Sequence, residues 1–267
     1  MQLTVAPQAA AIGGKSYIYA IVACGSSGIE GSLGGSLGGS LGIEGKDVCL
    51  VTDGRVAAVV SAVAGSKIRP ARANLSAHQA VLQRLMRETT PLPMAFGSIA
   101  SSGEAIHRML VRNRRSFEEQ LGRVAGKVEM GLRVAWNAPN IFEYLVGADA
   151  ELRAARDRLL AAGGASTRNE KIELGRAFER RLNQQREEHT RKVGRALASV
   201  AAEFKVNPCR SEPEVMNAAC LVRREAQEEF RAAVETAAKL FDENFTFDYN
   251  GPWAPYNFVE LELDLEK

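Results

Sequence analysis

The longest periodic pattern in this sequence does most to constrain its fold. From Leu174 to Phe204, apolar side chains recur every three, four or seven residues, which places them along one side of a helix of about eight turns. Such a helix has to bury its apolar stripe against another part of the molecule. The residues of this stripe are Phe178, Leu182, His189, Val193, Leu197, Val200 and Phe204.

Strand patterns lie on both sides of this helical region. Lys127–Trp136 alternates apolar and polar residues with a period of two, and Phe258–Leu265 does the same. Between them, Met216–Val222 favours a strand, Glu225–Phe241 a helix and Phe245–Tyr249 a further strand. The order strand, helices, strand, helix, strand, strand is compatible with a split β-α-β, ferredoxin-like sandwich.

Three strands are predicted earlier in the chain. Ser16–Cys24, Asp47–Thr52 and Arg55–Val63 are rich in β-branched residues. The dipeptide Asp53-Gly54 fits a tight hairpin in which both turn positions have positive φ. We therefore expect these three strands to be neighbours in one sheet.

Two amphipathic helices are expected after these strands. The first opens at Asn74, whose side chain is a suitable N-cap, and the second spans Ser102–Leu121. The segment Pro91–Ile99 between them favours a short strand. This part of the chain therefore predicts a mixed α/β unit.

These patterns divide the chain into two α+β domains. Residues 1–126 are expected to form an N-terminal mixed α/β domain that carries a Gly/Ser-rich loop at 25–45. Residues 127–267 are expected to form a C-terminal ferredoxin-like sandwich with a long helical insertion at about 148–205. A length of 267 residues agrees with two domains.

Composition excludes several classes of protein. Hydrophobic residues at 46% and charged residues at 25% are typical of a globular chain, and a net charge of +2 is too balanced to indicate nucleic-acid binding by itself. The four cysteines form no C-x-x-C pair, which suits a reducing compartment. The sequence has no signal-peptide pattern and no apolar stretch long enough to cross a bilayer. We therefore expect a cytoplasmic protein that does not bind membranes.

The Gly/Ser-rich loop contains no complete phosphate-binding motif. Its glycine spacing forms no G-x-G-x-x-G, and Gly45-Lys46 is followed by Asp47 where a Walker loop needs a hydroxyl residue. G-x-S-x-G occurs twice, around Ser36 and Ser40, but no apolar helix follows either serine, as a nucleophile elbow requires. A hydrolase that uses one of these serines stays as an alternative, and it would lose activity when that serine is replaced by alanine.

The three histidines form no catalytic or metal-binding set in the sequence. His78, His107 and His189 each fall within an expected helix, and His189 lies on the apolar stripe, where a packing role is more common. No H-E-x-x-H motif or carboxylate pair accompanies them. We therefore predict that the protein is not an enzyme and has no cofactor and no metal site.

A nucleic-acid-binding α+β scaffold is the main alternative. The basic helix 168–205 carries cations that would meet phosphates. Against this, Glu187 and Glu188 precede Arg191 and Lys192 by four residues, the spacing of intrahelical ion pairs, and no aromatic residues interleave with the charges. A solvated face is the preferred interpretation, so we expect no nucleic-acid partner.

Several segments occur together in an order that indicates a family. They are YIYAIV at Tyr17–Val22, a Gly-Ile-Glu-Gly step before a strand, PLPMAFGSI at Pro91–Ile99, NAACLV at Asn217–Val222 and, most specific of all, GPWAPYNF at Gly251–Phe258. With these segments the sequence resembles the gas vesicle protein F/L family over nearly its whole length.

The resemblance implies a non-enzymatic accessory protein for the assembly of gas vesicles, the gas-filled protein shells that give cells buoyancy. It implies the gas vesicle shell protein and other gas vesicle accessory proteins as partners. Shell subunits expose apolar surface before assembly, because the finished shell excludes water, and an accessory protein would shield or present them. The candidate partner-binding residues are Trp253, Tyr256 and Phe258, for which packing in a core or turn is the commoner role.

The resemblance also implies a single Gly-Ile-Glu-Gly where this chain has two copies, at Gly28–Gly31 and Gly42–Gly45. We interpret the second copy and the Gly-Ser-Leu units as an expanded hairpin connector between the first two strands. Each doubling of such a loop costs only about 0.6 kcal/mol. Deletion of Ser32–Glu44 is therefore predicted to leave folding and vesicle formation intact.

Overall fold

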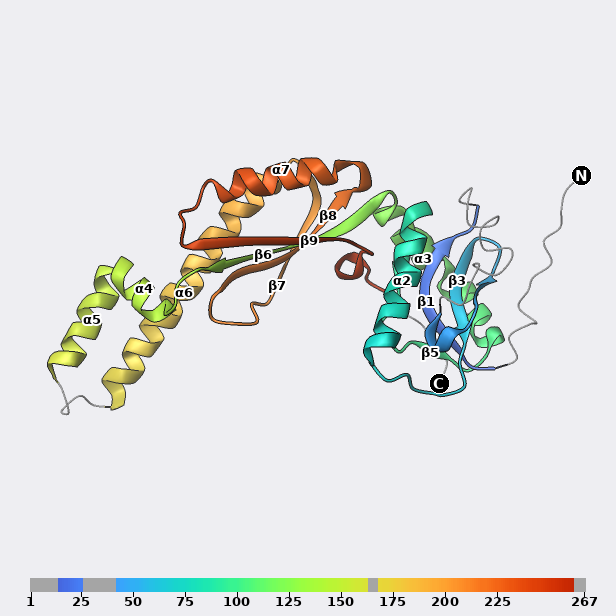
Figure 1. Ribbon diagram of the computed structural model, residues 1–267, viewed down its shortest axis with the longest axis horizontal. Helices are drawn as coiled ribbons and strands as arrows, with labels where there is room; N and C mark the ends of the chain where they lie inside the picture. The colour runs from blue at the N-terminus through green and yellow to red at the C-terminus, as the bar shows by residue number, and fades with distance from the viewer. Residues whose placement is uncertain (1–13, 26–41, 163–167, 262–267) are drawn as a thin grey trace, which may run out of the picture. The chain divides into compact units, whose positions relative to one another are not determined.

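The computed structural model describes residues 14–25, 42–162 and 168–261, which form two compact units. Residues up to Glu129 and those from Pro252 onward make the first unit, and Met130–Gly251 makes the second. Each unit contains an antiparallel sheet with helices packed against it, so the predicted α+β class is confirmed (Figure 1). These units differ from the domains expected from the sequence at residues 127–129 and 252–261, which lie in the first unit.

The sheet of the first unit is built around β1 (Ser16–Ala23). β1 pairs with β3 (Val56–Ala62) along most of its length and, on its other edge, with the short strands β4 (Leu92–Pro93) and β5 (Ile99–Ala100). β2 (Val48–Thr52) pairs with β3. Because β3 lies between β1 and β2, the expected hairpin between the first two strands is wrong, although the three strands do share one sheet as predicted.

The β2–β3 hairpin turns at Asp53-Gly54, as predicted. Gly54 has a φ of 93°, whereas Glu44 is the one residue other than glycine with positive φ in the described part of the chain. The expectation that both turn residues adopt positive φ is therefore wrong. The Asp53 carboxylate instead accepts hydrogen bonds from the backbone N–H groups of Arg55 and Val56, each at 2.9 Å. These side-chain-to-backbone bonds stabilise the turn.

Two helices, α2 (Arg72–Glu88) and α3 (Gly103–Val124), pack against this sheet (Figure 1). Ser102 caps α3 by accepting a hydrogen bond from the Ala105 backbone N–H at 3.1 Å. Asn74 is not the N-cap of α2, because the helix begins two residues earlier and the Asn74 amide donates to the carbonyl of Arg69 at 3.0 Å.

The elements of the second unit are β6 (Lys127–Trp136), α4 (Ile141–Ala148), α5 (Ala150–Ala161), α6 (Arg168–Leu197), β7 (Ala201–Asn207), β8 (Glu214–Arg223), α7 (Gln227–Ala238) and β9 (Phe245–Trp253). Among the described residues, the strands form an antiparallel sheet in the order β7-β8-β6-β9, which the α-helices accompany. Asp149 caps α5 by accepting from the backbone N–H groups of Glu151 and Leu152, and its other carboxylate oxygen lies 2.9 Å from Arg181 on α6.

The long helix ends earlier than its apolar stripe predicts. α6 stops at Leu197, and the chain turns so that the Val200 backbone N–H donates to the Leu197 carbonyl. Phe204 then lies in β7, opposite Cys220 of β8. In β7 the apolar residues Ala202, Phe204 and Val206 alternate with polar ones, so this edge strand does have a period of two. The expected helix extended too far because Val200 and Phe204 also continue the helical spacing of the apolar stripe.

The strand expected at Phe258–Leu265 is not present in the described residues. Phe258 ends a short 3-10 helix, η5 (Tyr256–Phe258), and Val259–Leu261 is neither helix nor strand. Glu262–Leu265 lies outside the described residues. Up to Leu261, the alternating pattern of this segment therefore does not correspond to a strand.

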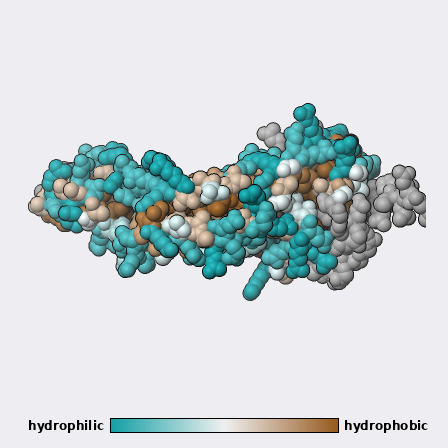
Figure 2. All heavy atoms as spheres, turned by 90° about the horizontal axis from the view of Figure 1, so that it is seen from above, coloured by the Kyte–Doolittle hydropathy of each residue, from teal (hydrophilic) through white to brown (hydrophobic). Residues whose placement is uncertain are grey.

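No described helix combines the length and the apolar character that a membrane crossing requires. Figure 2 shows one face of the molecule, which is mainly hydrophilic with hydrophobic patches between the polar areas.

Candidate functional site

The segment Trp253–Phe258, called here the WAPYNF segment, is anchored in the first unit. Phe258 is 2% exposed and Ala254 is 1% exposed. The Phe258 backbone N–H donates to the carbonyl of Pro255 at 3.1 Å, which closes the turn that carries the ring inward. The two prolines restrict the backbone on either side of Trp253 and so favour this one conformation.

A buried carboxylate holds the next residue of the segment. Glu129 is 6% exposed, and its two oxygens accept from Asn257, one from the backbone N–H at 2.7 Å and one from the side-chain amide at 2.6 Å. Hydrogen bonds to a charged acceptor contribute about 1.5–3 kcal/mol each. This pair therefore fixes the segment firmly to the start of β6.

A partly buried chain of hydrogen bonds holds Tyr256. Its hydroxyl lies 2.6 Å from Nε2 of His78 on α2, and Nδ1 of His78 lies 2.9 Å from the hydroxyl of Tyr17 on β1. The Tyr17 hydroxyl also accepts from the backbone N–H of Gly97 at 3.2 Å. In a neutral imidazole one nitrogen donates and the other accepts, so both ring nitrogens of His78 are satisfied.

Tyr19 ties the second Gly-Ile-Glu-Gly copy to the same cluster. Its hydroxyl accepts from the Ile43 backbone N–H at 2.8 Å and lies 2.7 Å from Ser61 Oγ, and its ring stacks on His78. Ile43 is fully buried, and a Cβ added at Gly42 would lie 2.4 Å from the Lys46 carbonyl. Gly42 and Ile43 are therefore part of the core, although Glu44 and Gly45 are exposed, and this corrects the interpretation of the second copy as a mere connector.

Burial sets the protonation states of this cluster. It lowers the pKa of His78 to about 4 and raises the pKa of Tyr17 to about 12, because the apolar surroundings disfavour both charged forms. The pKa of Tyr256 is also raised, first by burial and then by the nearby Tyr17 and Glu129. At neutral pH His78 and the tyrosines Tyr17, Tyr19 and Tyr256 are therefore uncharged, and they form a structural hydrogen-bond network.

The stability of the first unit is expected to fall in mild acid because of His78. The unfolded chain protonates His78 near pH 6.5, whereas the folded unit does so only near pH 4. Between these values the unfolded state binds one more proton, so stability falls by about 1.4 kcal/mol for each pH unit of acidification. Urea unfolding at several pH values measures this slope, and a His78→Gln variant that keeps the full slope would contradict the assignment.

The three predicted partner-binding residues differ in accessibility. Trp253 and Tyr256 are 36% and 40% exposed, and the exposed Leu75 lies one helical turn before His78, the partner of the Tyr256 hydroxyl. Phe258 is buried and packs in the core, the commoner role of such a ring. Trp253 and Tyr256 therefore present ring surface to the outside of the first unit, whereas Phe258 does not.

The other two histidines also make contacts within the fold. His107 Nδ1 lies 3.2 Å from the Thr52 carbonyl, and the half-buried His189 packs against Phe241 and Phe245, in agreement with its predicted packing role. Within residues 14–25, 42–162 and 168–261, no group of three His, Cys, Asp or Glu side chains is arranged to hold a metal ion. Ser36 and Ser40 lie outside the described residues.

The cluster around His78 was not predicted from the sequence. Its members Tyr17, Tyr19, His78 and Glu129 come from β1, α2 and β6, and no local pattern links them. The one available signal is the pair of tyrosines two residues apart in a strand, which places both rings on the same face.

The chain matches a known protein family along most of its length. The family model for the gas vesicle synthesis protein GvpL/GvpF matches residues 15–260. The chain therefore belongs to the GvpL/GvpF family, as the sequence resemblance indicated.

Individual relatives agree with this assignment. Gas vesicle protein F of Streptomyces sp. (strain CB03234) is 27% identical over 92% of this chain and 100% of its own length. Gas vesicle protein L of the same strain is 29% identical over 82% of this chain and 86% of its own length. The crystal structure of the gas vesicle protein GvpF from Anabaena sp. PCC7120 is similar in fold, with a TM-score of 0.78 and 23% identity over 93% of this chain and 99% of that one.

Proposed function

We propose that this protein is a non-enzymatic accessory protein for gas vesicle assembly that binds the hydrophobic shell protein and helps its nucleation or incorporation. The observation that carries the proposal is the match to the GvpL/GvpF family over residues 15–260. The protein would act at the gas vesicle, within the cytoplasm, together with other gas vesicle accessory proteins.

The WAPYNF segment supplies a contact surface that fits this role. Trp253, Tyr256 and Leu75 of the first unit are exposed. The segment itself is anchored by the buried Phe258 and by the hydrogen bonds that Asn257 donates. A rigid aromatic surface contributes binding energy at a low entropic cost, because little has to be ordered on binding. Such a surface suits an apolar partner better than a polar one.

The second unit, we infer further, has a ferredoxin-like arrangement. Its strand order β7-β8-β6-β9 corresponds to the second, third, first and fourth strands of a β-α-β-β-α-β unit. α6 and α7 both contact β8, and α4, α5 and α6 occupy the position of the first helix in an enlarged form. These features support the long helical insertion expected within this fold.

Binding of the shell protein can be tested by a pull-down with labelled shell protein. We expect the wild-type chain to retain it and the Trp253→Ala variant to bind about tenfold more weakly or worse, as for a central interface aromatic. Tyr249→Ala is the matched control, because Tyr249 is a similarly exposed ring, at 42%, on the second unit. Unchanged binding by a folded Trp253→Ala variant would sink the site, and no binding by the wild type would sink the function.

A further inference from the structure

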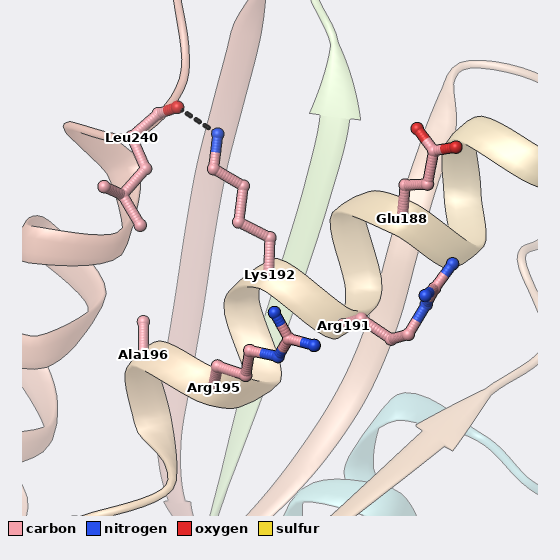
Figure 3. Close-up of a pocket in the computed structure, with 6 residues that line it drawn as sticks. All are labelled: Glu188, Arg191, Lys192, Arg195, Ala196 and Leu240. Carbon is pink, nitrogen blue, oxygen red and sulfur yellow. Dashed lines mark hydrogen bonds between the residues drawn. The ribbon is translucent and has the colours of Figure 1, made fainter.

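The second unit carries a basic hollow on its surface, called here the α6 hollow. It has a volume of about 430 Å³ and opens between the last turns of α6 and the chain after α7. Figure 3 shows that cationic side chains of α6 dominate its lining. The lining residues are Glu188, Arg191, Lys192, Arg195, Ala196 and Leu240.

The cations of the α6 hollow lack carboxylate partners. Arg191, Lys192 and Arg195 are exposed, and within the described ranges of the chain none of them forms an ion pair. Arg191 donates to the backbone carbonyl of Glu187 at 3.3 Å, and Lys192 donates to the carbonyl of Leu240 (Figure 3). The intrahelical ion pairs expected with Glu187 and Glu188 are therefore absent from the described part of the structure.

Two other arginines of α6 are paired with carboxylates. Arg176 lies 2.8 Å from Glu173, and Arg181 lies 2.9 Å from Asp149. The hollow, in contrast, brings together three cations that form no ion pair within the described residues. The ammonium of Lys192 is also positioned, because it lies 4.5 Å from the centre of the Phe241 ring.

The spacing of the cations indicates the form of their ligand. Arg191 and Arg195 are one helical turn apart, a rise of about 6 Å along the helix axis. Carboxylates on alternate residues of an extended chain are separated by about 6.6 Å. A Glu-x-Glu segment lying along α6 would therefore place one carboxylate at each guanidinium, where bidentate hydrogen bonds are available.

The remaining lining residues favour a protein over a nucleic acid. Leu240 is 49% exposed and, with Ala196, offers apolar surface to the residues between the carboxylates. The lining contains no aromatic ring on which a base could stack, whereas single-stranded nucleic acids are usually bound on such rings. We propose that the α6 hollow binds an extended acidic segment of a partner protein, with carboxylates on alternate residues. This site does not depend on the shell-protein contact proposed at Trp253.

Fluorescence anisotropy with two labelled peptides tests the proposal on the full chain. One probe alternates Glu and Ala over eight residues, and the other alternates Gln and Ala. We expect the acidic probe to bind and the neutral probe not to bind. The Arg191→Glu, Arg195→Glu variant should bind the acidic probe about tenfold more weakly or worse, and added salt should weaken wild-type binding.

The matched control is the Arg176→Glu, Arg231→Glu variant. It changes the net charge by the same amount at two arginines of the same unit that lie near carboxylates. This control should bind the acidic probe as the wild type does. Equal losses in the two variants, or equal binding of the two peptides, would overturn the proposal. Tighter binding of a mixed-sequence single-stranded oligonucleotide, lost in the Arg191→Glu, Arg195→Glu variant, would also overturn it and identify a nucleic-acid site.

Discussion

The Phe258→Ala variant is expected to lose about 3–5 kcal/mol of unfolding free energy in the first unit, the usual cost of removing a buried phenylalanine ring. Phe258 is 2% exposed and is held by a turn that Asn257 and Tyr256 fix to Glu129 and His78. Those hydrogen bonds keep the segment in place, so the surroundings cannot collapse fully into the vacated space and a cavity remains. Urea unfolding followed by near-ultraviolet circular dichroism measures the loss.

An exposed apolar residue of the same unit provides the control for this prediction. Val111 on α3 is 46% exposed, and Val111→Ala should change stability by no more than about 0.5 kcal/mol. If Phe258→Ala costs no more than this control, the ring is not a core residue. Phe258 would then return to the set of partner-binding candidates beside Trp253.

The Ile43→Ala variant is expected to cost about 2–5 kcal/mol, because its side chain is fully buried beside the Tyr19 hydroxyl. The first Gly-Ile-Glu-Gly copy offers an identical isoleucine at Ile29, which complicates the measurement in the full chain. Deletion of Gly28–Leu41 removes this complication, since it leaves one copy followed directly by Lys46. The substitution should therefore be measured in that shortened chain.

The shortened chain is itself a test of the loop. Deletion of Gly28–Leu41 and deletion of Ser32–Gly45 produce the same sequence, because the two copies are identical. We expect the shortened chain to differ from the wild type by no more than about 1 kcal/mol, since loop length has a weak effect on stability. This replaces the deletion of Ser32–Glu44, which would leave one extra glycine before Lys46. A large loss of stability in the shortened chain, or a negligible effect of Ile43→Ala within it, would contradict the assigned role of Gly42–Gly45.

Local patterns predicted the separate elements of this fold well. Lys127–Trp136 was expected as a strand from its period of two, and it forms β6 with the same bounds. The strands near the start of the chain, the Asp53-Gly54 turn and the helix after Ser102 were likewise predictable, because each depends on residues close in sequence.

The errors arose where distant residues decide the structure. β3 lies between β1 and β2, an arrangement that no turn residue encodes. The alternating segment after Asn257 was interpreted as a strand, yet Phe258 turns into the core of the first unit because Glu129 binds the preceding residue from 128 positions away. For the same reason the sequence identified the GPWAPYNF segment as important without showing which of its rings are anchors.

The central claim, that the protein binds and shields the shell protein, is tested most directly by light scattering. Shell protein diluted from denaturant should aggregate because its apolar surface is exposed to water. With an equimolar amount of this protein present, we expect the scattering to be suppressed, and we expect less suppression with the Trp253→Ala variant. Aggregation of the shell protein at the same rate with and without the wild-type chain would contradict the account.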